Sequence, residues 1–274
     1  MERFLVPLDF TEVSANALRY AYAFNKHYFA QLHVLHVFDV PFAASMENDA
    51  GLVEYERIRK SFTDKIWTFI ADNREEYHYD TQVTAISGGD LQGIINHVEE
   101  NDIHLVILGN KGKTGLGRWF FGTVTRSLLR HPPCKVISVP GSYNWTEIKQ
   151  ILVCTDLSLP LTDEQCDELR DMANRLKARL VFLHVQDKVE IALPEDSISV
   201  NKIRSEFGVE LVTIPFLESI AGSVNHYIKT HGGELAVTLP HHHSWLDNLF
   251  LGSETATLSD ELSVPLLSLS GMKK

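Results

Sequence analysis

The pattern of apolar residues along the chain changes repeatedly between two periods. In the first half, short runs rich in β-branched residues are separated by segments whose apolar residues lie three or four positions apart, as on one face of a helix. Such alternation is typical of parallel strands joined by right-handed helical crossovers. Five strands are predicted in this half, over residues 3–8, 32–38, 81–86, 103–108 and 135–139.

The second half repeats the first. Three segments return in the same order: FLVPLD at 4–9 as ILVCTD at 151–156, LHVFD at 35–39 as LHVQD at 183–187, and FFGTVT at 120–125 as FLGSET at 250–255. Self-similarity of this length indicates two copies of one structural unit. The pattern predicts five further strands, near residues 150–154, 180–185, 209–213, 234–238 and 265–269.

The offset between the copies falls from 148 to 130 residues after the second strand. We therefore expect that the long helix predicted between Tyr55 and Ile70 has no counterpart in the second half. Another second-half helix is predicted to begin at Thr162, with Gln165 in capping-box register. The interpretation is two tandem domains, 1–142 and 143–274.

The predicted fold class is α/β, with two tandem open, mostly parallel five-stranded sheets and helices on both faces. Two similar domains can pack like the subunits of a dimer, about a pseudo-twofold axis. Residues 135–139 and 265–269 are the candidates for this pairing. A homodimer of the whole chain is a further hypothesis.

Composition excludes several classes of protein. The chain has no apolar run of about 20 residues, the length that spans a bilayer, and its start, MERFLVPLDF, is interpreted as a strand and not as a signal peptide. The three cysteines form no C-x-x-C pair, which predicts buried thiols in a cytoplasmic protein. A net charge of −11 argues against nucleic-acid binding.

Candidate chemistry lies in the stretch GNKGKTGLGRWFFGT, residues 109–123, between a predicted strand and a predicted helix. Glycines let backbone amides approach an anion, and a helix N-terminus carries partial positive charge. Residues 103–146 contain six Lys and Arg and no Asp or Glu. The stretch lacks the spacing of a P-loop and of a dinucleotide-binding G-x-G-x-x-G. In SGGD, residues 87–90, we interpret Asp90 as a helix cap.

The spacing that does fit is G-x2-G-x9-G-[ST], formed by Gly109, Gly112, Gly122 and Thr123. It resembles the signature of the nucleotide-binding branch of the universal stress protein family. The opening LVPLDFTEVSANAL, the LHVFD strand and the closing PPCKVISVP also resemble that family, in the right order. The resemblance extends through the second copy, so the chain resembles a tandem universal stress protein with a Rossmann-like, adenine nucleotide alpha hydrolase-like fold.

The resemblance implies an adenine nucleotide as ligand: ATP, ADP or AMP, with Mg²⁺ as a further candidate. Backbone amides and a hydroxyl would hold the phosphates and ribose. The residues implied are Pro7, Leu8 and Asp9 on the adenine and ribose side, Val37 at the adenine edge, and Gly109, Gly112, Gly122, Thr123 and Val124 at the phosphates. Asp9 has an alternative role as the cap of the helix that begins near Thr11.

The second copy is predicted to have lost the ligand. Leu239 and His242 stand where the first copy has Gly109 and Gly112, and only Gly252 and Ser253 survive from the motif. Residues 239–265 contain four acidic residues and no Lys or Arg. The run His241–His243 is interpreted as an exposed loop and not as a metal site. His33, His36 and His184 are expected to be structural.

The leading functional hypothesis is therefore a cytoplasmic stress-response protein that binds an adenine nucleotide in its N-terminal domain and acts as a regulatory or binding module. It has two alternatives. One is a structural or interaction protein without nucleotide. The other is a slow ATPase that uses Asp9 and Mg²⁺.

Overall fold

The computed structural model describes residues 1–39, 49–73, 80–110, 122–186, 197–239 and 262–269. Strands and helices alternate in both halves, as the apolar pattern predicts. The first half contains β1 (Arg3–Pro7), α1 (Glu12–Asn25), β2 (Gln31–Phe38), α2 (Asp49–Asn73), β3 (Thr81–Ser87), α3 (Asp90–Glu100), β4 (Leu105–Asn110), α4 (Thr123–Arg130) and β5 (Lys135–Pro140). The second contains β6 (Gln150–Cys154), α5 (Asp163–Leu176), β7 (Arg179–Gln186), α6 (Ile198–Phe207), β8 (Val212–Pro215), α7 (Ile220–His231), β9 (Leu235–Thr238) and β10 (Leu266–Ser268).

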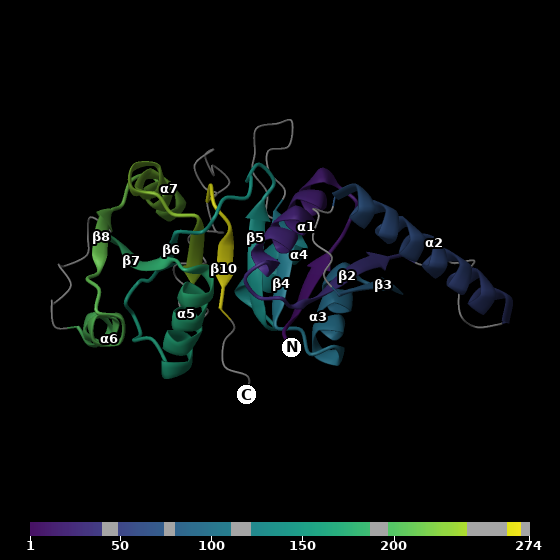
Figure 1. Cartoon of the computed structure of the whole chain (residues 1–274), viewed down its shortest axis with the longest axis horizontal. Helices are drawn as coiled ribbons and strands as arrows, with labels where there is room; N and C mark the ends of the chain where they lie inside the picture. The colour runs from purple at the N-terminus through teal and green to yellow at the C-terminus, as the bar shows by residue number, and fades with distance from the viewer. Residues whose placement is uncertain (40–48, 74–79, 111–121, 187–196, 240–261, 270–274) are drawn as a thin grey trace.

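The described strands form one continuous sheet in the order β3-β2-β1-β4-β5-β10-β9-β6-β7-β8. Neighbouring strands are parallel within each half, and only the central pair, β5 and β10, is antiparallel. Figure 1 shows this pair at the middle of the molecule, between the two halves. The expected α/β fold is confirmed, and the predicted pairing of the two fifth strands is present in the sheet.

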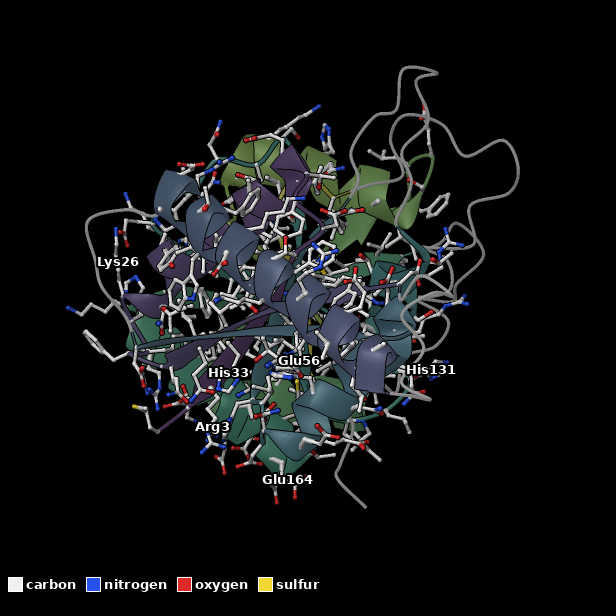
Figure 2. The ribbon with its side chains drawn as sticks, turned by 90° about the vertical axis from the view of Figure 1, so that its right-hand side faces the viewer. Arg3, Lys26, His33, Glu56, His131 and Glu164 are labelled. Atoms are coloured by element: carbon white, nitrogen blue, oxygen red, sulfur yellow. The ribbon has the colours of Figure 1, made fainter. Side chains whose placement is uncertain are left out.

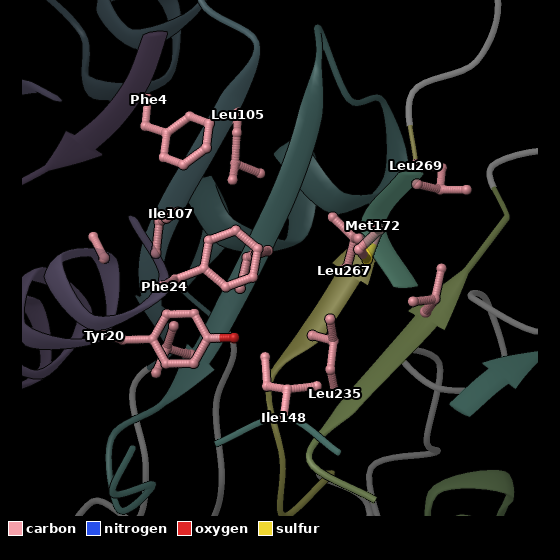
Figure 3. Close-up of a cluster of buried hydrophobic side chains, with 14 of the residues drawn as sticks. Phe4, Tyr20, Phe24, Leu105, Ile107, Ile148, Met172, Leu235, Leu267 and Leu269 are labelled. Carbon is pink, nitrogen blue, oxygen red and sulfur yellow. The ribbon is translucent and has the colours of Figure 1, made fainter. Parts of the chain in front are cut away.

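Helices cover both faces of the sheet. Buried side chains of α1, α2, α5 and α6 belong to the apolar core on one face, and those of α3, α4 and α7 to the core on the other. Lys26 and His131, which follow α1 and α4, accordingly project from opposite sides in Figure 2. Each core contains residues of both halves. Figure 3 shows Phe24 and Ile107 of the first half and Leu267 of the second in one cluster of buried side chains.

One predicted feature is wrong. The second half keeps a helix between its second and third strands, α6, which has 10 residues where α2 has 25. Ser197 caps its N-terminus, and Gly208 ends it in the left-handed conformation, with φ of 65°. Its side chains Val200 and Ile203 are buried in the shared core. The second copy, which is about 18 residues shorter in this region, thus has a shortened helix and has not lost it.

The segment around the predicted domain boundary is tied to both halves. Asn16 in α1 donates hydrogen bonds to the carbonyl oxygens of Pro140 and Tyr143, at 3.1 and 2.9 Å. A carboxylate oxygen of Glu234 accepts from the backbone amides of Lys149 and Gln150, at 3.0 and 2.9 Å. The boundary near residue 143 therefore lies in a packed connection.

Two expectations from composition concern single features. Cys134, Cys154 and Cys166 are free and buried, as predicted. In the described ranges, no helix is both long and apolar enough to cross a bilayer.

Candidate functional site

A cavity of ≈ 400 Å³ opens at the carboxyl ends of β1, β2 and β4 in the first half. Ligands of open parallel sheets bind at this edge, where strand ends and helix N-termini meet. The cavity brings together eight of the nine residues that the sequence singled out: Pro7, Leu8, Asp9, Val37, Gly109, Gly122, Thr123 and Val124. The ninth, Gly112, lies outside the described residues, as do the nearby bases Lys111, Lys113 and Arg118.

The loop between β1 and α1 answers the question that the sequence left open for Asp9. Thr11, and not Asp9, is the N-cap of α1, because its hydroxyl accepts from the Ser14 amide at 3.3 Å. The Asp9 carboxylate accepts from the amide and the hydroxyl of Thr11, at 3.1 and 2.5 Å. Asp9 therefore braces the cap residue, and its exposed side chain lines the cavity.

Phe10 holds this loop in place. Its φ of +61° is the left-handed conformation that side chains other than glycine rarely adopt. The ring is anchored against His36, with ring centroids 4.5 Å apart, and it stacks near Phe62 of α2. His36 in turn donates from Nδ1 to the Leu8 carbonyl at 2.8 Å. The position of Asp9 is thus fixed by packing on α2.

The second half repeats these contacts. Leu157 has the same φ of 61°, and Asp156 accepts a hydrogen bond from the Ser158 amide at 2.9 Å. His184 donates from Nδ1 to the Thr155 carbonyl at 3.1 Å. His36 and His184 are therefore satisfied structural imidazoles, as the sequence analysis expects.

The two described glycines of the motif have different surroundings. A Cβ on Gly109 would lie 2.6 Å from Val13 Cγ1 and 2.7 Å from the Val13 carbonyl oxygen, because β4 and the start of α1 touch there. A Cβ on Gly122 would meet nothing nearer than 3.9 Å. Packing therefore requires glycine at position 109. At position 122 packing would allow a side chain, and glycine leaves the space beside the cavity open.

The N-terminus of α4 supplies the polar end of the cavity. Gly122 is its N-cap and has no side chain to bond the free amides of the first turn. Thr123 and Val124, in that turn, line the cavity. The Thr125 hydroxyl donates to the Gly109 carbonyl at 3.3 Å and ties the helix to the end of β4. Such a helix end attracts anions.

The structure also corrects one prediction and adds residues that the sequence analysis missed. The N-cap of α3 is Gly89 and not Asp90, which is the first helical residue and lines the cavity. An apolar floor is formed by Leu35, Ile94 and Leu108. The available signal for Asp90 was its position in the short turn after a strand, because the ends of neighbouring parallel strands share one edge.

The corresponding part of the second half differs. The register of β9 on β6 places Leu239 where Gly109 stands, since Leu235 pairs with Ile151 as Leu105 pairs with Phe4. The Leu239 side chain is 1% exposed and belongs to the shared core, as do Leu157 and Leu161. The segment between β6 and α5 is also longer than that between β1 and α1. His241–His243, Gly252 and Ser253 lie outside the described residues.

A preformed metal site is absent from the part of the chain that the structure describes. There, no group of three or more His, Cys, Asp or Glu side chains is arranged to hold an ion.

Residues 1–140 match the sequence profile of the universal stress protein family. Universal stress protein MJ0531 of Methanocaldococcus jannaschii is 22% identical over 138 residues, which are 50% of this chain and 81% of that protein. Universal stress protein YxiE of Bacillus subtilis is 26% identical over 148 residues, with 50% of this chain and 97% of that protein covered.

Among solved structures, a universal stress protein of Archaeoglobus fulgidus is similar over 98% of both chains, with a TM-score of 0.68 and 16% identity. A functionally unknown protein of Pseudomonas aeruginosa covers 98% of this chain and 92% of its own, with a TM-score of 0.63 and 16% identity. These likenesses show that the fold of both halves, joined in one chain, recurs in other proteins.

Proposed function

Because this chain belongs to the universal stress protein family, we propose that its N-terminal half binds ATP or another adenine nucleotide. The bound state would control the conformation or the choice of partner of the protein, which then acts as a regulatory module in the cytoplasm. The observation that carries the proposal is Gly122. The fold has room for a side chain at this position, yet glycine leaves the amide end of α4 open to the cavity.

The chemistry of the cavity matches the parts of a nucleotide. The apolar floor of Leu35, Ile94 and Leu108 suits a flat base, which is stabilised by burial. The first turn of α4 and the Thr123 hydroxyl suit phosphate oxygens. Asp9 follows β1, which lies between β2 and β4 in the sheet, and its carboxylate lines the cavity and can accept from ribose hydroxyls. Mg²⁺ bound with the nucleotide would offset phosphate charge near Asp9.

Isothermal titration with ATP, ADP and AMP tests the proposal, with Gly122→Asp and Gly122→Asn as matched variants. Aspartate and asparagine are both good N-caps and have nearly the same shape, so both variants should keep α4. Only aspartate adds a negative charge where phosphate would bind. We expect Gly122→Asp to weaken ATP binding at least tenfold more than Gly122→Asn does.

Two results would contradict the proposal. If none of the three nucleotides gives a binding heat, the alternative of an interaction protein without nucleotide would be favoured. Equal ATP affinities of the two variants would show that the phosphates do not bind at the N-terminus of α4. The same titrations give the stoichiometry, for which we propose one nucleotide per chain because Leu239 replaces Gly109 in the second half.

A further inference from the structure

We propose that Asp90 recognises the exocyclic amino group of the base and makes the site selective for 6-aminopurines over 6-oxopurines. This inference rests on the proposed function, because it assigns the base specificity of the same cavity. It begins from a carboxylate in the first turn of α3 that lines the cavity, whose phosphate end is formed by the first turn of α4.

The order of the strands sets the order of the groups along the cavity. Asp90 follows β3, Val37 ends β2, Asp9 follows β1 and Gly109 ends β4, and these four strands are neighbours in the order β3-β2-β1-β4. Strands lie about 4.8 Å apart, so the ends of β2 and β4, on either side of β1, are about 10 Å apart. A nucleotide with its phosphates at α4 therefore extends its base toward Val37 and Asp90.

Close packing brings Asp90 to the end of β2. A Cβ on Gly93 would lie 3.0 Å from Val37 Cγ2 and 3.3 Å from Ile86 Cδ1, so the first turn of α3 rests directly on the Val37 side chain. Upstream of the helix, the Gly88 amide donates to the Phe38 carbonyl at 3.2 Å. The segment that carries Asp90 is thus attached to β2 on both sides of the residue.

The Asp90 carboxylate is available for a ligand. It lies at an exposed position, and the contacts among the described residues include no hydrogen bond or ion pair of this side chain. It stands in the first turn of α3, where the helix dipole favours a negative charge. Ile94, one turn later, is 3% exposed and forms part of the apolar floor. A base on this floor presents its edge to Asp90.

A carboxylate distinguishes the two classes of purine by charge and by hydrogen bonding. An ionised carboxylate only accepts hydrogen bonds, so it pairs with a 6-amino group. A 6-oxo group also only accepts, and two acceptors facing each other leave both unsatisfied in a partly desolvated site. An asparagine at position 90 removes this preference, because its amide can donate to a 6-oxo group and accept from a 6-amino group.

The test is the ratio of the dissociation constants for ITP and ATP, measured by isothermal titration on the full chain. We expect the unmodified protein to bind ATP at least tenfold more tightly than ITP, and Asp90→Asn to lower this ratio about tenfold. Glu99→Gln is the matched control, since it makes the same change of charge at an exposed position near the other end of α3, and it should keep the original ratio.

The outcomes separate this inference from the proposed function. If ATP binds and Asp90→Asn keeps the same ratio as Glu99→Gln, the assignment of Asp90 is wrong while nucleotide binding stands. If neither nucleotide binds to the unmodified protein, the proposed function fails and the assignment fails with it.

Discussion

Ile137 in β5 lies directly opposite Leu267 in β10, at the centre of the antiparallel pair that joins the two halves. The two residues are 130 positions apart, which is the offset of the repeat in this region, so they are equivalent residues of the two copies. Their neighbours cross over, with Val136 opposite Ser268 and Ser138 opposite Leu266. Equivalent residues meet in this way at the axis of a twofold contact.

The shared core predicts that both halves unfold together. Ile137→Ala removes a fully buried side chain and should lower the free energy of unfolding by about 2–5 kcal/mol. Circular dichroism in urea should show one transition, and hydrogen exchange should show equal loss of protection in both halves. Glu99→Gln serves as the exposed control. Two separate transitions, with only the first half destabilised, would contradict the shared core.

The strands were predictable because each is a short apolar run bounded by helix-period segments, and the repeat confirmed one half by the other. The presence of α6 could not be predicted from the offset between the copies alone, because a loss of 18 residues is compatible with a deleted or a shortened helix. Its caps, Ser197 and Gly208, were the signal that decides.

The candidate site shows a similar division. The resemblance to the family selects residues that the fold gathers around one cavity, but the sequence favours Asp90 as a cap because aspartate is common there. Its place in the first turn depends on the packing of Gly93 against Val37, which is a tertiary contact. The roles of the site residues toward a nucleotide stay predictions.

The two motif glycines should respond differently to alanine. Gly109→Ala forces a Cβ against the backbone of Val13, so α1 or β4 must move, and we expect a loss of about 1–3 kcal/mol in stability. Gly122→Ala meets no clash and should cost less, about 0.5–1 kcal/mol, because alanine is a poorer N-cap than glycine. Thermal unfolding of both variants checks this contrast. Equal melting temperatures would show that the approach of Val13 to Gly109 is not restrictive.

A buried pair of histidines should make stability depend on pH. His33 Nδ1 lies 3.3 Å from His97 Nε2, and His33 Nε2 lies 3.2 Å from Gln31 Oε1. The Gln31 oxygen can only accept, so His33 carries its proton on Nε2 and accepts from His97. Burial, with the neighbouring His97 as the next cause, lowers the pKa of His33 to about 4, and burial also lowers the pKa of His97.

The direction follows from proton linkage. Unfolded His33 has a pKa near 6.5, so between about pH 6.5 and pH 4 the unfolded chain binds more protons than the folded one, and stability falls as the pH falls. One pKa unit corresponds to about 1.4 kcal/mol, which gives His33 an effect of up to about 3 kcal/mol across this window. The free energy of unfolding, measured in urea at several pH values, should change less steeply with pH for His33→Gln than for the unmodified protein. An unchanged slope would contradict the assignment.

The two hydrogen bonds of the Asn16 side chain should stabilise the connection between the halves. Its side chain is 9% exposed, and its amide nitrogen serves two carbonyls, those of Pro140 and Tyr143. Asn16→Ala leaves both carbonyls without this donor, at a cost of about 1–3 kcal/mol. Asn16→Asp places an acceptor-only carboxylate against the same two oxygens, so it should be more destabilising than alanine in spite of its closer shape. Urea unfolding gives the order of the two variants, and hydrogen exchange of residues 141–149 shows whether the connection opens. If aspartate is the milder change at neutral pH, the two hydrogen bonds of Asn16 do not hold the connection, and other contacts do.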